Sequence, residues 1–360
     1  MMRRTHIAVT CIGGRYTYDL CTALRTADDL DAFIVGIDAN ADAAGRRFVD
    51  VFAVLPMAEE DPERYIAALF ALHARERLDV ILPGSEAECR VLAAHRDALL
   101  AAGIIPAVPA HDIVSCLTDK RATLAFLAAR GIAVGAFAVV DDWCVAREAA
   151  ARLGYPDRRV VLKPGRSTGS RGVIILDARV RTFRSLLPDL PERACGTGSL
   201  DAAVAQGIAL AGYLAMPYYG GAVYDVDVVA RGGIPEQVIP RLRLYDPLLP
   251  VNAGCRVACE PDIMEYVGAI VRAFGIHGAC DFDIARDADG APRLLDASVR
   301  MSGAVGAAVV AGANVPAAVV RVLLGYPARP EAVHDGLVMY PVAHFAPVIA
   351  ASVPARVPVL

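Results

Sequence analysis

Short apolar runs and helical patterns alternate over roughly the first hundred residues, and this order constrains the fold more than any other feature. Runs at 6–11, 33–37 and 80–82 indicate strands, and amphipathic segments at 18–24, 65–74 and 87–100 indicate helices. Alternating strands and helices require a parallel sheet with right-handed crossovers. The turns after these strands, at 13–14, 38 and 83–85, are therefore expected at the carboxyl edge of the sheet, where open α/β sheets bind ligands.

Composition excludes several classes of protein. The 360 residues, 56% of them hydrophobic, can form packed cores in two or three domains. A net charge of −4 and an aromatic content of 6% argue against nucleic-acid binding and favour a small ligand. The nine cysteines are isolated and form no CxxC pair, which is typical of reduced thiols in a cytoplasmic protein.

The stretch between Arg300 and Arg321 carries no charge and resembles a membrane span in composition. It is rich in Ala, Gly and Val, but Gly312, Asn314 and Pro316 interrupt it. This pattern predicts two small-residue helical pieces packed against a core, and no membrane-spanning helix.

Lysine is rare in this chain. Of the 36 basic residues 34 are Arg, and the two Lys are Lys120 and Lys163. A compact, rotatable ammonium suits sites that a planar guanidinium does not fit. The bias therefore marks both lysines as candidate functional residues, with chance as the alternative.

Lys163 stands at the end of an apolar strand, 160–163, and a loop rich in Gly and Ser follows at 165–172. Glycines let a backbone approach an anion closely, so such a loop can present its N–H groups to phosphate. It is not a Walker A loop, because the lysine precedes the glycines. The alternative is an ordinary hairpin turn.

A helix is expected at 118–129 and a surface loop at 188–200. The rest of the chain predicts strands at 224–230 and 235–242, a helix at 263–274, and a hairpin of 279–285 with 293–296. Alternation places Asp281 and Asp283 on one face of this hairpin. Asp296, Ser298 and Arg300 likewise share a face. If the two faces coincide, the oxygens suit Mg²⁺ bridging ATP phosphates, and the guanidinium can neutralise a transferring phosphoryl group.

Together these segments resemble the ATP-grasp enzymes, in particular the branch that includes the synthetase halves of the carbamoyl phosphate synthetase large subunit. The likeness covers nearly the whole chain, through motifs at 119–120, 162–164, 165–172, 296–300 and 312–316 in the family's order. It implies an α/β protein with the ATP-grasp fold. The expected parts are an N-terminal Rossmann-like parallel-sheet domain (1–112), a small α+β lid (113–214), an α+β C-terminal catalytic domain (215–330) and a tail packed on the core (331–360).

The resemblance also implies roles for individual residues, with ATP and Mg²⁺ or Mn²⁺ as cofactors. Lys120 would contact the α-phosphate and Lys163 the α/β-phosphates, and Arg300 would be the catalytic arginine, with Lys163 also assisting catalysis. The loop that closes over the β/γ-phosphates would contribute Ser167, Thr168, Gly169, Ser170 and Gly172. The adenine hinge would consist of Met216, Tyr218, Tyr219 and Gly220, and the metal ligands would be Asp283, Asp296 and Ser298.

Members of this family generally activate a carboxylate as an acyl phosphate that an amine then attacks. The expected activity is therefore an ADP-forming ligase that joins small amino-acid-like molecules. One alternative is a bicarbonate-using carboxylating or carbamoyl-phosphate-type synthetase. Another is a catalytically weakened binding protein, since Pro217 and Val223 stand where Glu is common in the family and Ser298 stands in place of Asn.

Substrate recognition is less clearly encoded. Arg241 and Arg243 lie two apart in a strand, so they share a face and could clamp a carboxylate, although a solvated strand face is the alternative. Ser85 and Glu86 could bind a substrate amino group, but Ser85 with Glu88 also fits a helix cap. The expected partners are small carboxylates and amines, without nucleic acid or membrane, in a cytoplasmic protein for which a homodimer is a further expectation.

Overall fold

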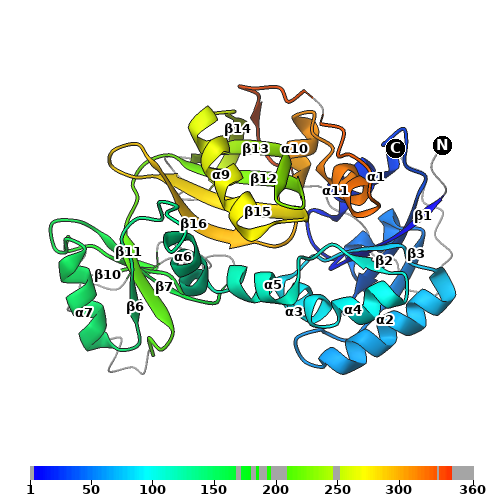
Figure 1. Cartoon of the computed structure of the whole chain (residues 1–360), viewed down its shortest axis with the longest axis horizontal. Helices are drawn as coiled ribbons and strands as arrows, with labels where there is room; N and C mark the ends of the chain where they lie inside the picture. Colours follow the sequence, from blue (N-terminus) through cyan, green and yellow to red (C-terminus); the bar gives the residue numbers. More distant parts are fainter. Residues whose placement is uncertain are drawn as a thin grey trace.

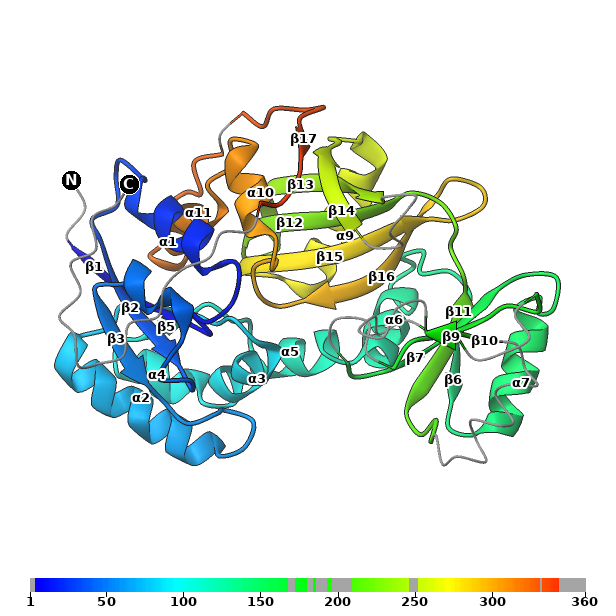
Figure 2. The same ribbon diagram turned by 180° about the vertical axis from the view of Figure 1, so that it is seen from behind.

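The computed structural model describes residues 4–167, 172–179, 184–185, 193–195, 209–245, 252–330 and 332–342. Three sheets organise these residues (Figure 1). Buried residues of the first and third sheets share hydrophobic clusters, and the second sheet lies at the end of the molecule away from the first sheet (Figure 2).

The first sheet is parallel, as the alternating pattern predicts. Its strand order is β3-β2-β1-β4-β5, from β1 (Thr5–Thr10), β2 (Ala32–Asp38), β3 (Val51–Val54), β4 (Val80–Leu82) and β5 (Ile105–Pro106). Its helices are α1 (Thr17–Arg25), the 3-10 helix η1 (Ala44–Phe48), α2 (Pro62–Glu76), α3 (Glu86–Ala94) and α4 (Arg96–Ala101). At the carboxyl edge Gly13 N donates to Asp38 Oδ2 at 2.7 Å, so the turns after β1 and β2 meet there as expected.

Two short helices, α5 (His111–Leu117) and α6 (Lys120–Ala128), lead to the second sheet. Its order is β6-β11-β7-β8-β10-β9, from β6 (Ala138–Val140), β7 (Val160–Pro164), β8 (Ile174–Leu176), β9 (Arg184–Ser185), β10 (Arg193–Cys195) and β11 (Tyr213–Pro217), with α7 (Trp143–Arg152) packed on it. A surface loop is expected at 188–200, but Arg193–Cys195 within this range form β10, which pairs with β8. β11 continues past residue 214, where a domain boundary is expected, because its residues through Pro217 pair with β7.

The third sheet is antiparallel, with the order β16-β15-β12-β13-β14-β17. Its strands are β12 (Val223–Arg231), β13 (Ile234–Tyr245), β14 (Asn252–Val257), β15 (Gly278–Arg286), β16 (Pro292–Ser298) and β17 (Val338–Met339), and α9 (Pro261–Phe274) packs on it. The expected strands, helix and hairpin of this region are thus confirmed. Most of the C-terminal tail, 343–360, lies outside the described residues.

The uncharged stretch after Arg300 forms α10 (Val305–Val310) and α11 (Val315–Leu323), which confirms the two helical pieces. Within the described part of the chain, no helix is long and apolar enough to cross a membrane. α11 packs on α1 and on strands β12 and β15, and Arg321 Nη2 of α11 lies 2.6 Å from Asp29 Oδ1. These contacts fasten the first domain to the third sheet.

Candidate active site

The two lysines reach the same strand from different elements. Lys120 begins α6 directly after its N-cap Asp119, and Lys163 lies near the end of β7. Lys120 Nζ is 3.0 Å from Asp296 Oδ1, and Lys163 Nζ donates to the carbonyl oxygen of Leu295 at 2.6 Å. Two ammonium groups therefore converge beside β16, as their rarity in the sequence suggests.

Lys163 is 6% exposed. Burial lowers its pKa to about 8, although the Asp296 carboxylate acts in the opposite direction. A lysine whose pKa lies this close to neutral pH binds anions well only while its amine is protonated. Lys163 Nζ donates to a main-chain carbonyl among the described residues, and an ammonium has three N–H donors, so the others are suited to an anionic ligand.

The segment after β7 is fixed at its base by charged groups. Asp119 accepts from Arg121 Nη2 at 2.9 Å, which lowers the pKa of Asp119 to about 2, and Arg166 Nε lies 3.3 Å from the same carboxylate. Lys120 Nζ donates to Ser167 O at 2.9 Å. Gly172 has a φ of 79°, which favours glycine. Thr168, Gly169 and Ser170, the other loop residues expected to contact phosphate, lie outside the described residues.

The third sheet presents a face rich in carboxylates. In the strand register Asp225 pairs with Asp283, and Asp227 pairs with Asp281. On the other side of β15, Asp281 faces Ser298 and Asp283 faces Asp296. Directly paired residues of antiparallel strands point to the same face, so the two faces of the hairpin do coincide.

Arg241 and Arg243 lie within this acidic face. Arg241 is 1% exposed, and its Nη2 lies 2.7 Å from Asp227 Oδ2. Arg243 Nη2 lies 2.7 Å from Asp283 Oδ1, and its Nε donates to Asp225 Oδ1 at 2.8 Å. In place of an open carboxylate clamp or a solvated strand face, the structure has an ion-pair network in which Arg241 is buried and Arg243 is partly exposed. Asp225 and Asp227 are functional candidates that the sequence analysis did not single out.

Asp283 and Asp296 provide oxygens suited to a hard cation. Burial raises the pKa of Asp283 to about 6, with the Asp225 and Asp296 carboxylates adding to the effect and Arg243 opposing it. No group of three or more His, Cys, Asp or Glu in the described ranges is arranged to hold a metal alone. Two facing carboxylates fit Mg²⁺ that is shared with phosphate oxygens, because Mg²⁺ in such sites usually takes one or two protein carboxylates.

The first domain adds a carboxylate to this site. Burial raises the pKa of Glu86, and so does the nearby Asp296 carboxylate, whereas Lys120 and Arg300 lower it, so all three groups lie near Glu86. Ser85 instead caps α3, since its Oγ accepts from Glu88 N at 3.2 Å in a capping box. The cap alternative for Ser85 is therefore confirmed. Arg300 Nη1 donates to Met301 O at 2.7 Å.

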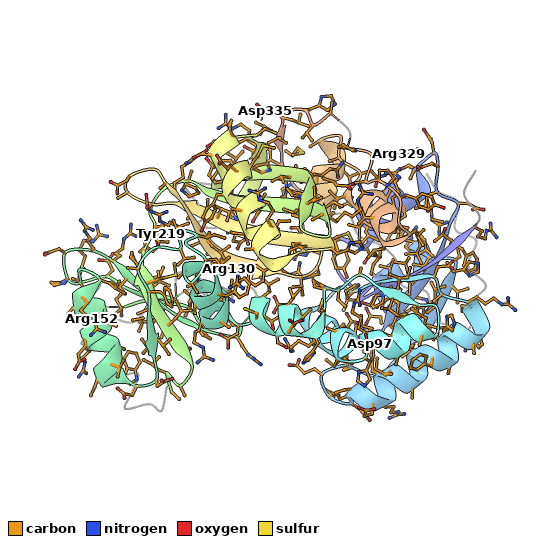
Figure 3. The ribbon with its side chains drawn as sticks, in the orientation of Figure 1. Asp97, Arg130, Arg152, Tyr219, Arg329 and Asp335 are labelled. Carbon is orange, nitrogen blue, oxygen red and sulfur yellow. The ribbon has the colours of Figure 1, made fainter. Side chains whose placement is uncertain are left out.

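The expected adenine hinge connects the second sheet to the third. Met216 is buried in β11, and Tyr218, Tyr219 and Gly220 lead into β12. Tyr218 N donates to Arg159 O at 3.1 Å, and the Arg159 guanidinium lies 3.9 Å from the centre of the Tyr218 ring. Tyr219 lies at the junction between the two sheets (Figure 3), and its buried hydroxyl has no hydrogen-bond partner within the described part of the chain.

Comparison with known proteins agrees with this geometry. Residues 210–345 match the family described as "ATP-grasp in the biosynthetic pathway with Ter operon". The L-amino acid ligase from Bacillus licheniformis superimposes with a TM-score of 0.63 at 16% identity, covering 90% of this chain and 75% of the ligase. Residues 210–345 thus resemble this ATP-grasp family. Comparison with curated protein sequences finds no match.

Other ATP-grasp structures superimpose equally well. N5-carboxyaminoimidazole synthetase from Staphylococcus aureus, complexed with ADP, gives a TM-score of 0.69 at 15% identity over 94% of this chain and 82% of its own. The biotin carboxylase domain of 2-oxoglutarate carboxylase from Hydrogenobacter thermophilus, with MgADP and bicarbonate, gives a TM-score of 0.65 at 16% identity. The match covers 91% of this chain and 71% of that domain's chain. At these identities the likeness establishes the ATP-grasp fold.

Proposed function

We propose that this ATP-grasp protein is an ADP-forming carboxylate–amine ligase that makes an amide or peptide bond between small amino-acid-like substrates. The observation that carries the proposal is the convergence of Lys120, Lys163 and Asp296 beside β16. Ammonium groups next to a carboxylate suit a phosphate chain and its divalent cation.

In the proposed reaction a carboxylate oxygen of one substrate attacks the γ-phosphorus of ATP, and ADP leaves. The neutral amine of the other substrate then attacks the acyl carbon, and the C–O bond to phosphate breaks with its electron pair leaving on phosphate. The nitrogen loses one proton, which the departing phosphate takes up. Lys120 and Lys163 hold the nucleotide phosphates, and Arg300 offsets the charge on the phosphoryl group in transfer. Asp283 and Asp296 would hold Mg²⁺, or Mn²⁺ in its place, and the metal would neutralise phosphate charge.

The substrates would bind between the acidic face of the third sheet and Glu86 of the first domain. Met216 to Gly220 would bind the adenine, and the loop 165–172 would close over the phosphates. The proposal also places the protein in the cytoplasm. Homodimerisation is an expectation that sedimentation velocity checks.

The test is ADP release from MgATP with pooled amino acids, together with trapping of the acyl phosphate by hydroxylamine as a hydroxamate. We expect wild-type turnover, and a loss of roughly a hundredfold or more in Lys163→Ala, because a positioned charge in the site is removed. Arg152→Ala is the control, since Arg152 is exposed on α7 at the far end of the second domain (Figure 3).

Three outcomes separate the alternatives. Hydroxamate formation with an amino acid supports the ligase. ADP release that depends on bicarbonate alone would favour the carboxylating or carbamoyl-phosphate-type synthetase, to which the two ADP-bound structural relatives lend weight. Binding of MgADP without any turnover would favour the catalytically weakened protein.

A further inference from the structure

We propose that Asp281 and Ser298 form a binding site for the primary ammonium group of the amine substrate. This inference rests on the proposed ligase function for its biological meaning, but it depends on a separate pair of residues. It also assigns Ser298 to the substrate instead of the metal, because Ser298 faces Asp281 and not Asp283 in the strand register.

The position of this pair is the first argument. Asp281 and Ser298 lie one step along the hairpin from the facing carboxylates Asp283 and Asp296. Two residues along a strand span about 7 Å, so the pair lies beyond the place proposed for the metal and phosphates. Arg300 follows β16 two residues after Ser298, and its guanidinium acts on the pKa of Glu86 of the first domain. An amine substrate bound there as its ammonium would lose one proton before its nitrogen attacks the activated carboxyl group.

The second argument is hydrogen bonding. Ser298 is 8% exposed. Within the described part of the chain, neither its Oγ nor Asp281 Oδ1 has a hydrogen-bond partner, although both atoms are enclosed. Enclosed polar atoms are nearly always paired in folded proteins, and leaving them unpaired is costly. An unpaired carboxylate oxygen faces an unpaired hydroxyl, which can accept as well as donate, so the pair can receive two N–H donors from one ligand.

The third argument is charge. Arg241 pairs with Asp227, Arg243 pairs with Asp225 and Asp283, and Lys120 pairs with Asp296. Among the described residues, these contacts account for every carboxylate of the face except Asp281. Asp281 therefore has no ion-pair partner among the described residues, and a bound ammonium would supply one.

The two oxygen atoms of Asp281 and Ser298 suit an ammonium better than a second metal ion. One carboxylate oxygen and one hydroxyl match two of the three N–H groups of a primary ammonium. Mg²⁺ demands six oxygens in a near-octahedral arrangement and is bound mainly through carboxylates and phosphates. The separate acceptor atoms also fit a compact ammonium better than a planar guanidinium fork.

The test uses methylammonium as the smallest primary ammonium and tetramethylammonium, which has no N–H group, as its control. Thermal unfolding of the full chain with MgADP is followed at constant ionic strength. We expect methylammonium to raise the wild-type Tm by about 3 °C at saturating concentration, and tetramethylammonium to leave it unchanged. Asp281→Asn and Ser298→Ala should lose this shift. Asp289→Asn, an exposed carboxylate in the turn of the same hairpin, should retain it.

Asp281→Asn has nearly the shape of the wild-type residue and removes a carboxylate that lacks a counterion, so its Tm without added amine should equal or exceed that of the wild type. Equal methylammonium shifts in Asp281→Asn and wild type would overturn the inference. So would a loss of stabilisation by Mg²⁺ in Asp281→Asn with the methylammonium shift intact, because the pair would then serve a metal.

A kinetic experiment separates this inference from the ligase proposal. Hydroxylamine is uncharged at neutral pH, so hydroxamate formation does not require an ammonium site. In wild type, methylammonium should inhibit this reaction competitively with hydroxylamine, and Asp281→Asn should raise its inhibition constant roughly tenfold or more. Absence of hydroxamate in wild type with every acid would reject the ligase function, while the unfolding experiment would still decide whether Asp281 and Ser298 bind an ammonium.

Discussion

At the residue scale, the protonation of Lys163 is central to the site. Its ammonium is buried, and burial lowers the pKa to about 8 from an ordinary value of 10.5. The charged form is the one that attracts phosphate. A ligand anion stabilises that form, so nucleotide binding and protonation of Lys163 favour each other.

We therefore expect the affinity for MgATP to fall as pH rises above about 8, by up to roughly tenfold per pH unit. Calorimetric titration between about pH 7 and pH 9 measures this dependence.

Thermal stability should change with pH in the opposite direction. Between pH 8 and 10.5 the unfolded chain binds the lysine proton and the folded chain does not, so stability contributed by this group rises with pH.

Lys163→Arg is the control for this prediction, because a guanidinium stays charged throughout that pH range. Its affinity for MgATP should be lower overall but should show a flatter pH dependence above pH 8 than that of wild type. An identical slope in both proteins would assign the titration to another group.

Ser85 and Glu86 are adjacent in sequence, but the structure gives them different tasks. Ser85→Ala removes the α3 cap and should lower the free energy of unfolding by about 1 kcal/mol without changing the KM for ATP. Glu86→Gln should keep or raise stability at neutral pH, because the pKa of Glu86 is raised and its ionised form is disfavoured in the folded state.

Glu86→Gln should nevertheless reduce kcat/KM for the substrates roughly tenfold or more, if Glu86 contacts substrate as proposed. Glu63→Gln is the matched control, since the side chain of Glu63 is 87% exposed. Urea unfolding and steady-state kinetics measure the two effects. A stability loss in Glu86→Gln equal to that of Ser85→Ala would assign Glu86 a structural role.

At the scale of elements, the hairpin of β15 and β16 presents the candidate metal ligands Asp283 and Asp296. A register shift between Asp283 and Ile284 lets Asp283 face Asp296 while Ile284 faces Leu294. This register shift leaves Leu295 without a partner residue on β15. The carbonyl oxygen of Leu295 accepts the hydrogen bond from Lys163. The bulge thus brings a main-chain acceptor and a carboxylate to the two lysines.

This arrangement predicts that Asp283→Asn and Asp296→Asn each weaken Mg²⁺ activation roughly tenfold or more, because each removes one of two facing carboxylate ligands. The measurement is ADP release against Mg²⁺ concentration at saturating ATP. Asp289→Asn should behave as wild type. An unchanged Mg²⁺ dependence in both site variants would exclude the hairpin as the metal site.

At the scale of the whole molecule, the candidate site combines residues from the parts of the chain around all three sheets, so its geometry depends on how these parts dock. Arg321 of α11 is 5% exposed and donates through Nε to Asp29 Oδ2 of the first domain at 3.1 Å. The hydrogen bonds from Arg321 hold the pKa of Asp29 below its ordinary value. This pair joins segments nearly 300 residues apart in sequence.

Asp29→Asn should lower the free energy of unfolding by about 2 kcal/mol, because it leaves the buried Arg321 without its counter-charge. Its neighbour Asp28→Asn, which is exposed, should have little effect. Urea unfolding provides the comparison. Since the pKa of Asp29 is lowered on folding, the contribution is full above the unfolded pKa and is lost as pH falls through the folded value.

Much of the architecture was predictable because it is written in local patterns. The parallel first sheet follows from alternating apolar runs, the hairpin from its turn residues, and both lysines from their rarity. The order of the motifs along the chain was enough to indicate the ATP-grasp fold. Each of these signals involves residues close together in sequence or a count over the whole chain.

Other features depend on contacts between distant segments. Arg241 and Arg243 became internal counterions of Asp225, Asp227 and Asp283 because β13 and β15 lie on opposite sides of β12. Ser298 faces Asp281 because of the register of a bulged hairpin, and Glu86 approaches Asp296 because the first domain docks on the third sheet. Strand register and docking arise from packing of the whole chain, so no short segment encodes them.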